Sequence, residues 1–234
     1  LQYASLTGTL SSALGSLTAL TDLRLNSGTM TGSIPSAFSS LTSLTKLHLR
    51  GLGLTGTLPA GLSSLTQLTH LYVDNNGLTG SIPASYASMT SMDTIDVRFN
   101  NMDGALPPQL DALTAMKYLF LSNNDFTGSI PTEYGSLTAL MHIECDSCDL
   151  SGAIPTEFGN LANLERIKLT NSGIAGNLPV TLGSVTSLIE LSLYGNALTG
   201  SIPDEYSALT NLAILNVSNS ASLGGALPSW AESL

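Results

Sequence analysis

The sequence predicts an α/β repeat fold: a curved solenoid with a parallel β-sheet on its concave face and turns or short 3-10 helices on its convex face. Three observations predict it: a fixed period of 24 residues, a short segment of alternating polarity in each period, and a Gly-x-Ile/Leu-Pro phrase after that segment. Such a period is typical of a solenoid, because a single repeat buries its apolar face only against its neighbours.

The period is defined by one apolar position that recurs at 24-residue steps without insertion or deletion. Its residues are Leu17, Leu41, Leu65, Met89, Leu113, Leu137, Leu161, Val185 and Leu209. In the unit at 65–88, the residues expected to point inward are Leu65, Leu68, Leu71, Val73, Leu78 and Ile82. The period predicts one domain over 1–234, with a truncated repeat at 1–16, eight full repeats at 17–208 and an atypical last repeat at 209–234.

Each repeat begins with a predicted strand. Polar and apolar residues alternate around Leu71 and Val73, which indicates a strand with one buried face. Stacked repeats would pair these strands in parallel. The phrase from Gly80 to Pro83 then turns the chain, because Gly tolerates a crowded bend and Pro ends strand pairing.

An asparagine position follows the strand. It is occupied by Asn76, Asn100, Asn124 and Asn196, whose side-chain amides can satisfy backbone groups left over by the turn. The same position holds Gly28, Leu52, Cys148, Ser172 and Ser220 in other repeats. We therefore expect an interrupted asparagine ladder that is weaker at those repeats.

The complete phrase, LxxLxxLxLxxNxLxGxIPxxLxxL, resembles the plant-specific class of leucine-rich repeats. That class is found in plant receptor-kinase ectodomains and polygalacturonase-inhibiting proteins, and related repeats occur in protist surface antigens, including those of trypanosomatids. The resemblance extends from the half-repeat at Leu6 to Leu10 through to Pro228. It implies a leucine-rich repeat solenoid at the cell surface or outside the cell, although the Cys-containing caps usual in plant ectodomains are absent from this sequence.

Composition argues against several functions. Seven basic and 17 acidic residues give a net charge of −10, which disfavours nucleic acid and anionic membrane surfaces. No apolar run approaches the roughly 20 residues that span a bilayer. Because Leu1 begins within the pattern, we expect a piece of a longer protein, attached to a membrane only through a flanking anchor, with end repeats that need covering. Trp230 is a candidate to shield the C-terminal end.

The polar strand positions predict a binding surface. All seven basic residues and all three histidines fall in the strand segments, and these polar columns change from repeat to repeat. Aromatics flanked by charge are typical of binding hot spots. The candidate ligand-binding residues are His70, Tyr72, Asp96, Arg98, Tyr118, Phe120, His142 and Glu144. We expect a protein, peptide or glycan ligand, with no cofactor and no catalytic residue. Of the four aromatics Tyr72, Phe99, Tyr118 and Phe120, we expect Phe99 to be the one that is partly buried.

Other interpretations of these strand residues remain open. The simplest is a solvated face with cross-strand ion pairs, such as Asp74 between Arg50 and Arg98. Glu144 and Asp146 lie about 6.6 Å apart on one strand, the spacing of an inverting glycosidase pair, but neighbouring cations favour two ionised carboxylates. A metal site from His48, His70, Asp74 and Asp96 lacks any motif spacing.

Three further features are noted. Cys145 and Cys148 predict buried packing thiols, with a local disulfide or redox pair as the alternative. Asn216-Val217-Ser218 is a glycosylation sequon. Hydroxyl columns suggest ice or crystal-surface binding as an alternative function: Thr31, Thr55, Thr79, Thr127 and Thr199, and Ser33, Thr57, Ser81, Ser129 and Ser201. Both columns are broken, by Asp103, Ala105, Ala153, Ala175 and Asn177.

Overall fold

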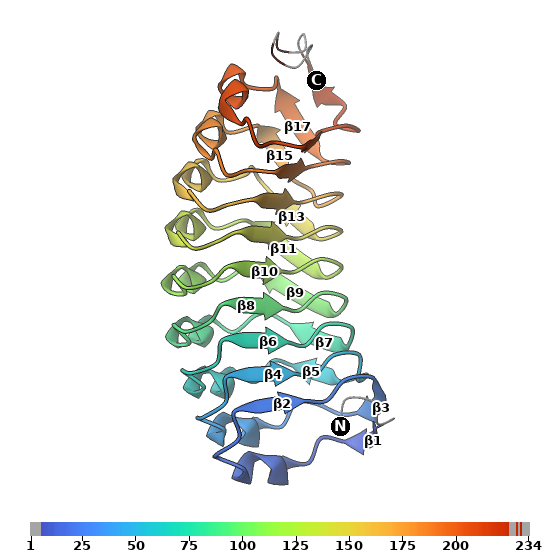
Figure 1. Ribbon diagram of the computed structural model, residues 1–234. Helices are drawn as coiled ribbons and strands as arrows, with labels where there is room; N and C mark the ends of the chain where they lie inside the picture. Colours follow the sequence, from blue (N-terminus) through green and yellow to red (C-terminus); the bar gives the residue numbers. More distant parts are fainter. Residues whose placement is uncertain (1–5, 225–227, 229, 231–234) are drawn as a thin grey trace.

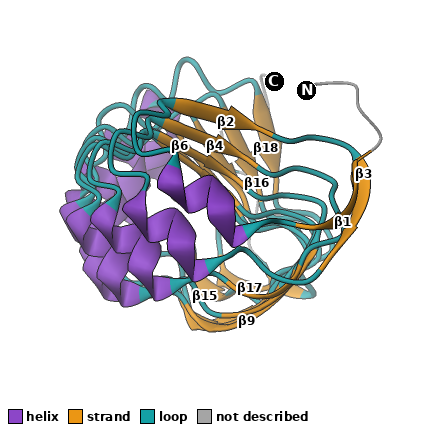
Figure 2. Cartoon of the chain, turned by 90° about the horizontal axis from the view of Figure 1, so that it is seen from below, coloured by secondary structure: helices purple, strands orange, loops and turns teal. Residues whose placement is uncertain are grey.

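The chain forms a stack of similar coils (Figure 1). A computed structural model describes residues 6–224, 228 and 230. Leu1, with which the predicted truncated repeat opens, and parts of the predicted last repeat therefore lie outside the described residues. Seen end-on, the stack has three sides, formed by one long sheet, a row of second strands and a row of 3-10 helices (Figure 2).

Within the described residues, the first strands of nine repeats form one parallel sheet in sequence order. They are β2 (Asp22–Arg24), β4 (Lys46–His48), β6 (His70–Tyr72), β8 (Thr94–Asp96), β10 (Tyr118–Phe120), β12 (His142–Glu144), β14 (Arg166–Lys168), β16 (Glu190–Ser192) and β18 (Ile214–Asn216). Paired residues are 24 apart, as in His48, Tyr72 and Asp96. The predicted columns of the sequence therefore run straight across the concave face of this sheet.

A second strand in each repeat was not predicted. These are β1 (Leu6–Thr9), β3 (Gly28–Thr31), β5 (Thr55–Thr57), β7 (Gly77–Gly80), β9 (Asn101–Ala105), β11 (Asp125–Ser129), β13 (Asp149–Ser151), β15 (Ala175–Asn177), β17 (Ala197–Gly200) and β19 (Ser222–Leu223). They form a flank that, among the described residues, divides into sheets β1-β3, β5 to β13 and β15 to β19. Their partners are 22 residues apart, as in Thr57 and Thr79, and 23 apart between β17 and β19, so a sequence column does not run straight across the flank.

Short 3-10 helices form the third side, as predicted. They are η1 (Ser12–Ser16), η2 (Ser36–Ser40), η3 (Ala60–Ser64), η4 (Ala84–Ser88), η5 (Pro108–Ala112), η6 (Thr132–Ser136), η7 (Thr156–Asn160), η8 (Val180–Ser184) and η9 (Asp204–Ala208). The proline of the turn phrase caps η2 to η9. None of the described helices has the length and hydropathy of a membrane span.

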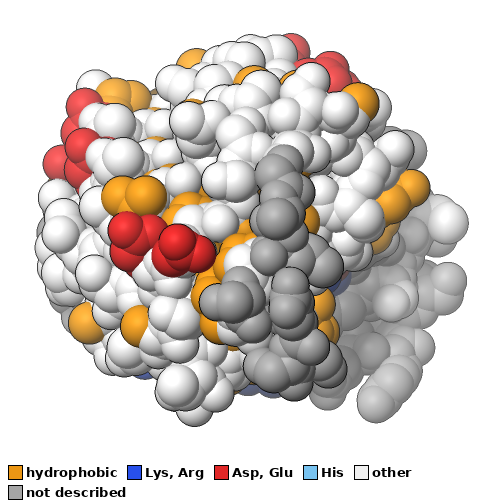
Figure 3. Space-filling view, turned by 90° about the horizontal axis from the view of Figure 1, so that it is seen from above, with side chains coloured by type: hydrophobic (Ala, Val, Ile, Leu, Met, Phe, Trp, Pro, Cys, Tyr) orange, Lys and Arg blue, Asp and Glu red, His pale blue; other side chains and the backbone are white. Residues whose placement is uncertain are grey.

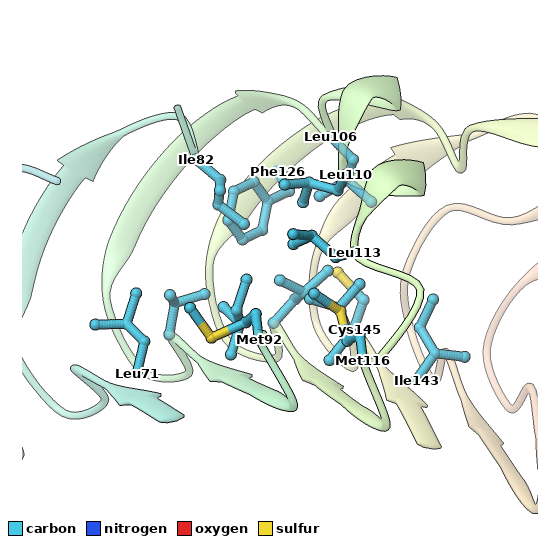
Figure 4. Close-up of a cluster of buried hydrophobic side chains, with 14 of the residues drawn as sticks. Leu71, Ile82, Met92, Leu106, Leu110, Leu113, Met116, Phe126, Ile143 and Cys145 are labelled. Atoms are coloured by element: carbon cyan, nitrogen blue, oxygen red, sulfur yellow. The ribbon is translucent and has the colours of Figure 1, made fainter. Parts of the chain in front are cut away.

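The core lies between these three sides. All six residues of the unit at 65–88 that were expected to point inward are at most 2% exposed. Figure 4 shows this packing over neighbouring repeats: Leu71, Met92 and Met116 follow one another in a row over the strands, and Ile82 and Phe126 lie on the opposite side of the core. The continuity explains why one repeat stabilises the next, since each apolar row is covered on both sides.

The asparagine ladder has the predicted role. Asn124 Nδ2 donates to the Val97 and Leu121 carbonyls at 2.9 and 2.8 Å, and its Oδ1 accepts from the Met102 amide at 3.0 Å. Asn76, Asn100 and Asn196 make corresponding bonds. Each amide therefore joins its own repeat to the preceding one.

The two cysteines form a disulfide with their Cα atoms 5.8 Å apart. The interpretation of Cys145 and Cys148 as packing thiols is therefore wrong, and the alternative of a local disulfide holds. Both residues are buried, so the sulfurs still fill core space. Cys148 occupies a ladder position, which means that the crosslink stands where other repeats have an asparagine amide.

The ends of the stack are more open than its centre. Leu17 is 50% exposed at one end and Ile214 is 45% exposed at the other. Trp230 packs partly buried against the core, as a shielding residue would. Figure 3 looks onto this C-terminal end, where hydrophobic side chains remain visible among polar atoms.

Candidate ligand-binding surface

The eight predicted site residues lie together on and just after four adjacent strands. β6 carries His70 and Tyr72, β10 carries Tyr118 and Phe120, and β12 carries His142 and Glu144, with Asp96 on β8 and Arg98 two residues after it. On each strand the central residue, such as Leu71 or Leu119, is buried in the core. The side chains on either side of it therefore face outward on the concave face.

The first half of the surface is organised by Arg50, which sequence analysis named only in an ion pair. Its guanidinium lies 4.4 Å from the centre of the Tyr72 ring. The same group pairs with Asp74 and, at 3.0 Å, with Asp96. Because Asp96 is fully buried and Asp74 nearly so, the arginine neutralises carboxylates beneath the surface while it supports one face of the ring.

The same arrangement recurs two repeats later. Arg98 donates to both carboxylate oxygens of Asp96, at 2.9 and 2.8 Å, and its guanidinium lies 4.5 Å from the centre of the Phe120 ring. Its remaining nitrogen is 3.7 Å from Glu144. Asp96 thus links the two arginines, and each arginine holds a ring on the next repeat.

Further rings pack around Phe120 and around Tyr72. Tyr118 and Phe120 lie nearly parallel with centroids 5.9 Å apart, and His142 meets Phe120 edge-on at 5.0 Å. His48 lies 4.7 Å and His70 5.9 Å from Tyr72. The result is an aromatic platform fixed from below by paired charges.

The histidines of this platform are held towards their neutral form. Burial lowers the pKa of His142, and Lys168 and Arg166 add to this effect, while Glu144 opposes it from 3.9 Å. Burial also lowers the pKa of His48 and of His70. At neutral pH the rings therefore present imidazole rather than imidazolium to a ligand.

Sequence analysis did not identify Asp93, an acidic residue directly before β8. Asp93 accepts from Lys117 at 2.7 Å and lies 3.9 Å from His70. Burial alone would raise the pKa of Asp93, but hydrogen bonds from Lys117 and Thr94 outweigh it and lower the pKa. Asp93 and Lys117 each lie directly before their strand. The only signal in the sequence for their ion pair is that they are 24 residues apart.

The strand carboxylates considered for catalysis and metal binding already have protein partners. Lys168 lies 3.9 Å from Glu144 and 3.5 Å from Asp146, and Ser122 donates to Glu144 at 2.7 Å. Asp74 and Asp96, proposed for a metal, are bridged by Arg50. These groups act in ion pairs, as the simplest interpretation expects, but the expected position of Asp74 between two arginines is only half right: Asp74 pairs with Arg50, whereas Arg98 pairs with Asp96 and lies near Glu144.

Phe99 was expected to be the most buried of the four aromatics, and this is wrong: Tyr72, Tyr118 and Phe120 are half-buried, whereas Phe99 is the exposed one. Its side chain is 50% exposed, and its backbone adopts a positive φ of 54°. The sequence pattern could not show this, because an aromatic directly after a strand is compatible with either environment.

The surface invites comparison with known proteins. A family model described as Leucine Rich Repeat matches residues 67–89, 115–137 and 187–209. The chain is a leucine-rich repeat protein. Its repeats are of the plant-receptor type, as the resemblance of the sequence implied: the LRR ectodomain of the plant membrane receptor kinase GASSHO1/SCHENGEN3 from Arabidopsis thaliana is 35% identical, with a TM-score of 0.96, over 99% of this chain and 28% of that one.

Two further solved structures extend the comparison. The Arabidopsis receptor kinase HAESA is 31% identical with a TM-score of 0.82, over 85% of this leucine-rich repeat chain and 33% of that one. A plant ice-binding protein is 26% identical with a TM-score of 0.83, over 96% of this chain and 72% of that one. The chain therefore spans about a third of the length of GASSHO1/SCHENGEN3 and of HAESA in these structures. A sequence search of curated proteins returns no significant match.

Proposed function

We propose that this leucine-rich repeat protein is a non-enzymatic recognition module that binds a protein or peptide on its concave face, outside the cell or at its surface. The observation that carries the proposal is the platform of Tyr72, Tyr118 and Phe120, supported by Arg50 and Arg98 over buried carboxylates. Supporting it, the similar ectodomains were solved with CASPARIAN STRIP INTEGRITY FACTOR 2 and with the peptide hormone IDA.

The platform suits binding because its order is established before a ligand arrives. Tyr72 and Phe120 each rest against a guanidinium, a contact worth about 0.5–1 kcal/mol at exposed sites, and Tyr118 stacks on Phe120. Both arginines are fixed in turn by Asp96. A ligand that covers these rings gains contact area with little further loss of side-chain freedom, which is the property of a binding hot spot.

Selection from a random peptide library on the immobilised chain tests the proposal. Peptides selected on the unmodified protein should lose about 2 kcal/mol of binding free energy, roughly 30-fold in Kd, when Tyr72→Ala or Phe120→Ala is introduced. Unfolding measurements on each variant keep binding separate from stability. Peptides that bind both variants as well as the unmodified chain would contradict the concave assignment, and selective binding to a glycan array would replace the peptide by a carbohydrate.

Ice binding is a second candidate, favoured by the similarity to a plant ice-binding protein that covers 72% of that protein's length. Exposed Thr57 and Thr79 lie opposite each other on the flank, but the next partner is Asn101, and Ala105 pairs with Thr127. Thermal hysteresis and ice recrystallisation measurements decide this candidate. Activity that disappears with Thr57→Ala and Thr79→Ala together would make the flank the functional surface.

We also propose that Asn216 carries a glycan if the protein is secreted. The sequon begins at the last residue of β18, and Asn216 Oδ1 accepts from the Ser218 hydroxyl at 2.7 Å. A glycan there would remove the C-terminal end of the concave face from ligand contact. Intact-mass spectra of native material before and after deglycosylation test this; an unmodified Asn216 would contradict it.

A further inference from the structure

One backbone position just past each concave strand is left-handed. The non-glycine residues there with φ of 50–61° are Ser27, Asn75, Phe99, Asn123, Ser147, Asn171 and Asn219. Gly51 and Gly195 occupy the same position with φ of 60° and 72°. Glycine and asparagine tolerate this conformation, whereas a bulky side chain is an outlier in it. Phe99 is therefore the exception in a column of small residues.

The repeat imposes this conformation on Phe99. Its backbone N–H donates to the Ser122 carbonyl at 3.0 Å, and its carbonyl accepts from the backbone N–H of Asn76 at 3.1 Å. The backbone is thus fixed by the repeats on both sides, and the side chain has no freedom to relax it. An asparagine at this position would fold more easily, by about tenfold in the equilibrium constant.

The ring gains little burial in return for the strain. Burial of the ring in the core would offset the backbone strain, but half of Phe99 is exposed. It directly follows Arg98, whose guanidinium supports Phe120. The loop that carries it follows β8, at the end of that arrow in Figure 1.

Building on the proposed function, we propose that Phe99 determines ligand specificity by extending the concave platform onto this rim. It provides an apolar contact for a hydrophobic side chain of the bound peptide, while Tyr72 and Phe120 hold the part of the peptide that crosses the strands. The inference rests on strain together with exposure. Folding favours a small residue at a left-handed position and a buried place for a large apolar side chain, so a residue that meets neither preference is expected to serve binding.

Two substitutions separate binding from strain. Phe99→Asn should raise the folding equilibrium constant by about tenfold in urea unfolding, because asparagine accepts the left-handed conformation. The same variant should weaken the peptides selected on the unmodified chain by about tenfold or more. Phe99→Leu keeps an apolar side chain and the strain, so its affinity should fall less and its stability should not rise. Asn123→Gly, at the same position one repeat later, serves as the matched control and should leave affinity unchanged.

The outcomes distinguish this inference from the proposed function. If Phe99→Asn leaves affinity unchanged while Tyr72→Ala and Phe120→Ala weaken binding, the inference is overturned and the concave site stands. If Phe99→Asn lowers stability, the ring is a packing residue and the inference is also overturned. If no selected peptide depends on Tyr72 or Phe120, or the library yields no binder, the proposed function fails and this inference fails with it.

Discussion

The concave sheet and the flank are built from the same 24-residue phrase, yet they differ in continuity and in composition. The concave strands pair without a break from β2 to β18, and their outward columns change from repeat to repeat. The flank strands pair in separate groups and repeat Thr, Ser and Gly. The flank hydroxyls of Thr55 and Thr79 make only long bonds to the preceding repeat, donating to the Gly32 and Gly56 carbonyls at 3.4 Å. Regularity here reflects structure, whereas variation on the concave face fits a role in recognition.

The breaks in the flank coincide with gaps in the asparagine ladder. Leu52 and Ser172 replace the ladder asparagine, and the glycine that follows each, Gly53 or Gly173, has a positive φ. Each glycine lies just before a strand that does not pair with the preceding flank strand. Gly53 precedes β5, which does not pair with β3, and Gly173 precedes β15, which does not pair with β13. The gaps at Gly28, Cys148 and Ser220 leave the flank strands paired. Among the described residues, flank pairing is therefore interrupted only where a ladder gap is followed by a left-handed glycine, and the concave sheet is continuous at both places.

The largest expected effect is at one of these breaks. A Cβ on Gly173 would overlap the Leu150 carbonyl oxygen, far inside van der Waals contact, and its φ is 75°. Gly173→Ala should therefore destabilise the protein by about 3 kcal/mol or more, as strain and a backbone clash combine. Gly51→Ala is the control, because its φ is 60° but nothing lies within 4 Å of the added Cβ. Urea unfolding should give it a loss of only about 1 kcal/mol; equal losses would contradict the clash.

The next effect tests the ladder where it is intact. Asn124→Ala leaves the Val97 and Leu121 carbonyls and the Met102 amide without their buried partner. We expect a loss of about 2–3 kcal/mol in the free energy of unfolding. Asn101→Ala, an exposed neighbour on β9, should change stability by less than about 0.5 kcal/mol. Hydrogen exchange should show faster opening of β9 than of β8 in Asn124→Ala, and the reverse order would contradict the link between ladder and flank.

A smaller effect distinguishes the two surfaces by pH. All three histidines lie on concave strands, and burial lowers the pKa of His142 below its usual value. The unfolded chain binds a proton near pH 6.5 and the folded chain at lower pH. Stability should therefore fall as pH drops below about 6.5, by at most about 1.4 kcal/mol per pH unit for one group. His142→Gln should reduce this slope in urea titrations between about pH 7 and pH 5, and an unchanged slope would assign it elsewhere.

The sequence predicts the buried frame well because the period fixes its register. Leu71 and Val73 are buried as expected, and the ladder amides bond as expected. The columns of the concave face were predictable for the same reason, since paired residues are 24 apart. The eight candidate residues were thereby brought onto one surface.

Other features depend on geometry that the period does not specify. The segment Gly77–Gly80 forms a flank strand although its sequence has the composition of a turn. The diagonal contact of Arg50 with Tyr72 depends on side-chain rotamers, and the left-handed φ of Phe99 is fixed by neighbouring repeats. The disulfide likewise depends on the distance between Cys145 and Cys148, which no spacing in the sequence determines.

The smallest expected effect is the sharpest comparison of the two surfaces. Thr55→Ala and Thr79→Ala together remove exposed hydroxyls whose bonds to the preceding repeat are long, at 3.4 Å, while the backbone pairing of β5 with β7 is retained. We expect a change of less than about 0.5 kcal/mol per site in unfolding free energy and no change in Kd for peptides that depend on Phe120. Because the flank and the concave platform share only the rigid core between them, a loss of peptide affinity in this variant would mean that the ligand reaches the flank. In that case the binding surface would follow the hydroxyl columns, and the variation of the concave face would need a different explanation.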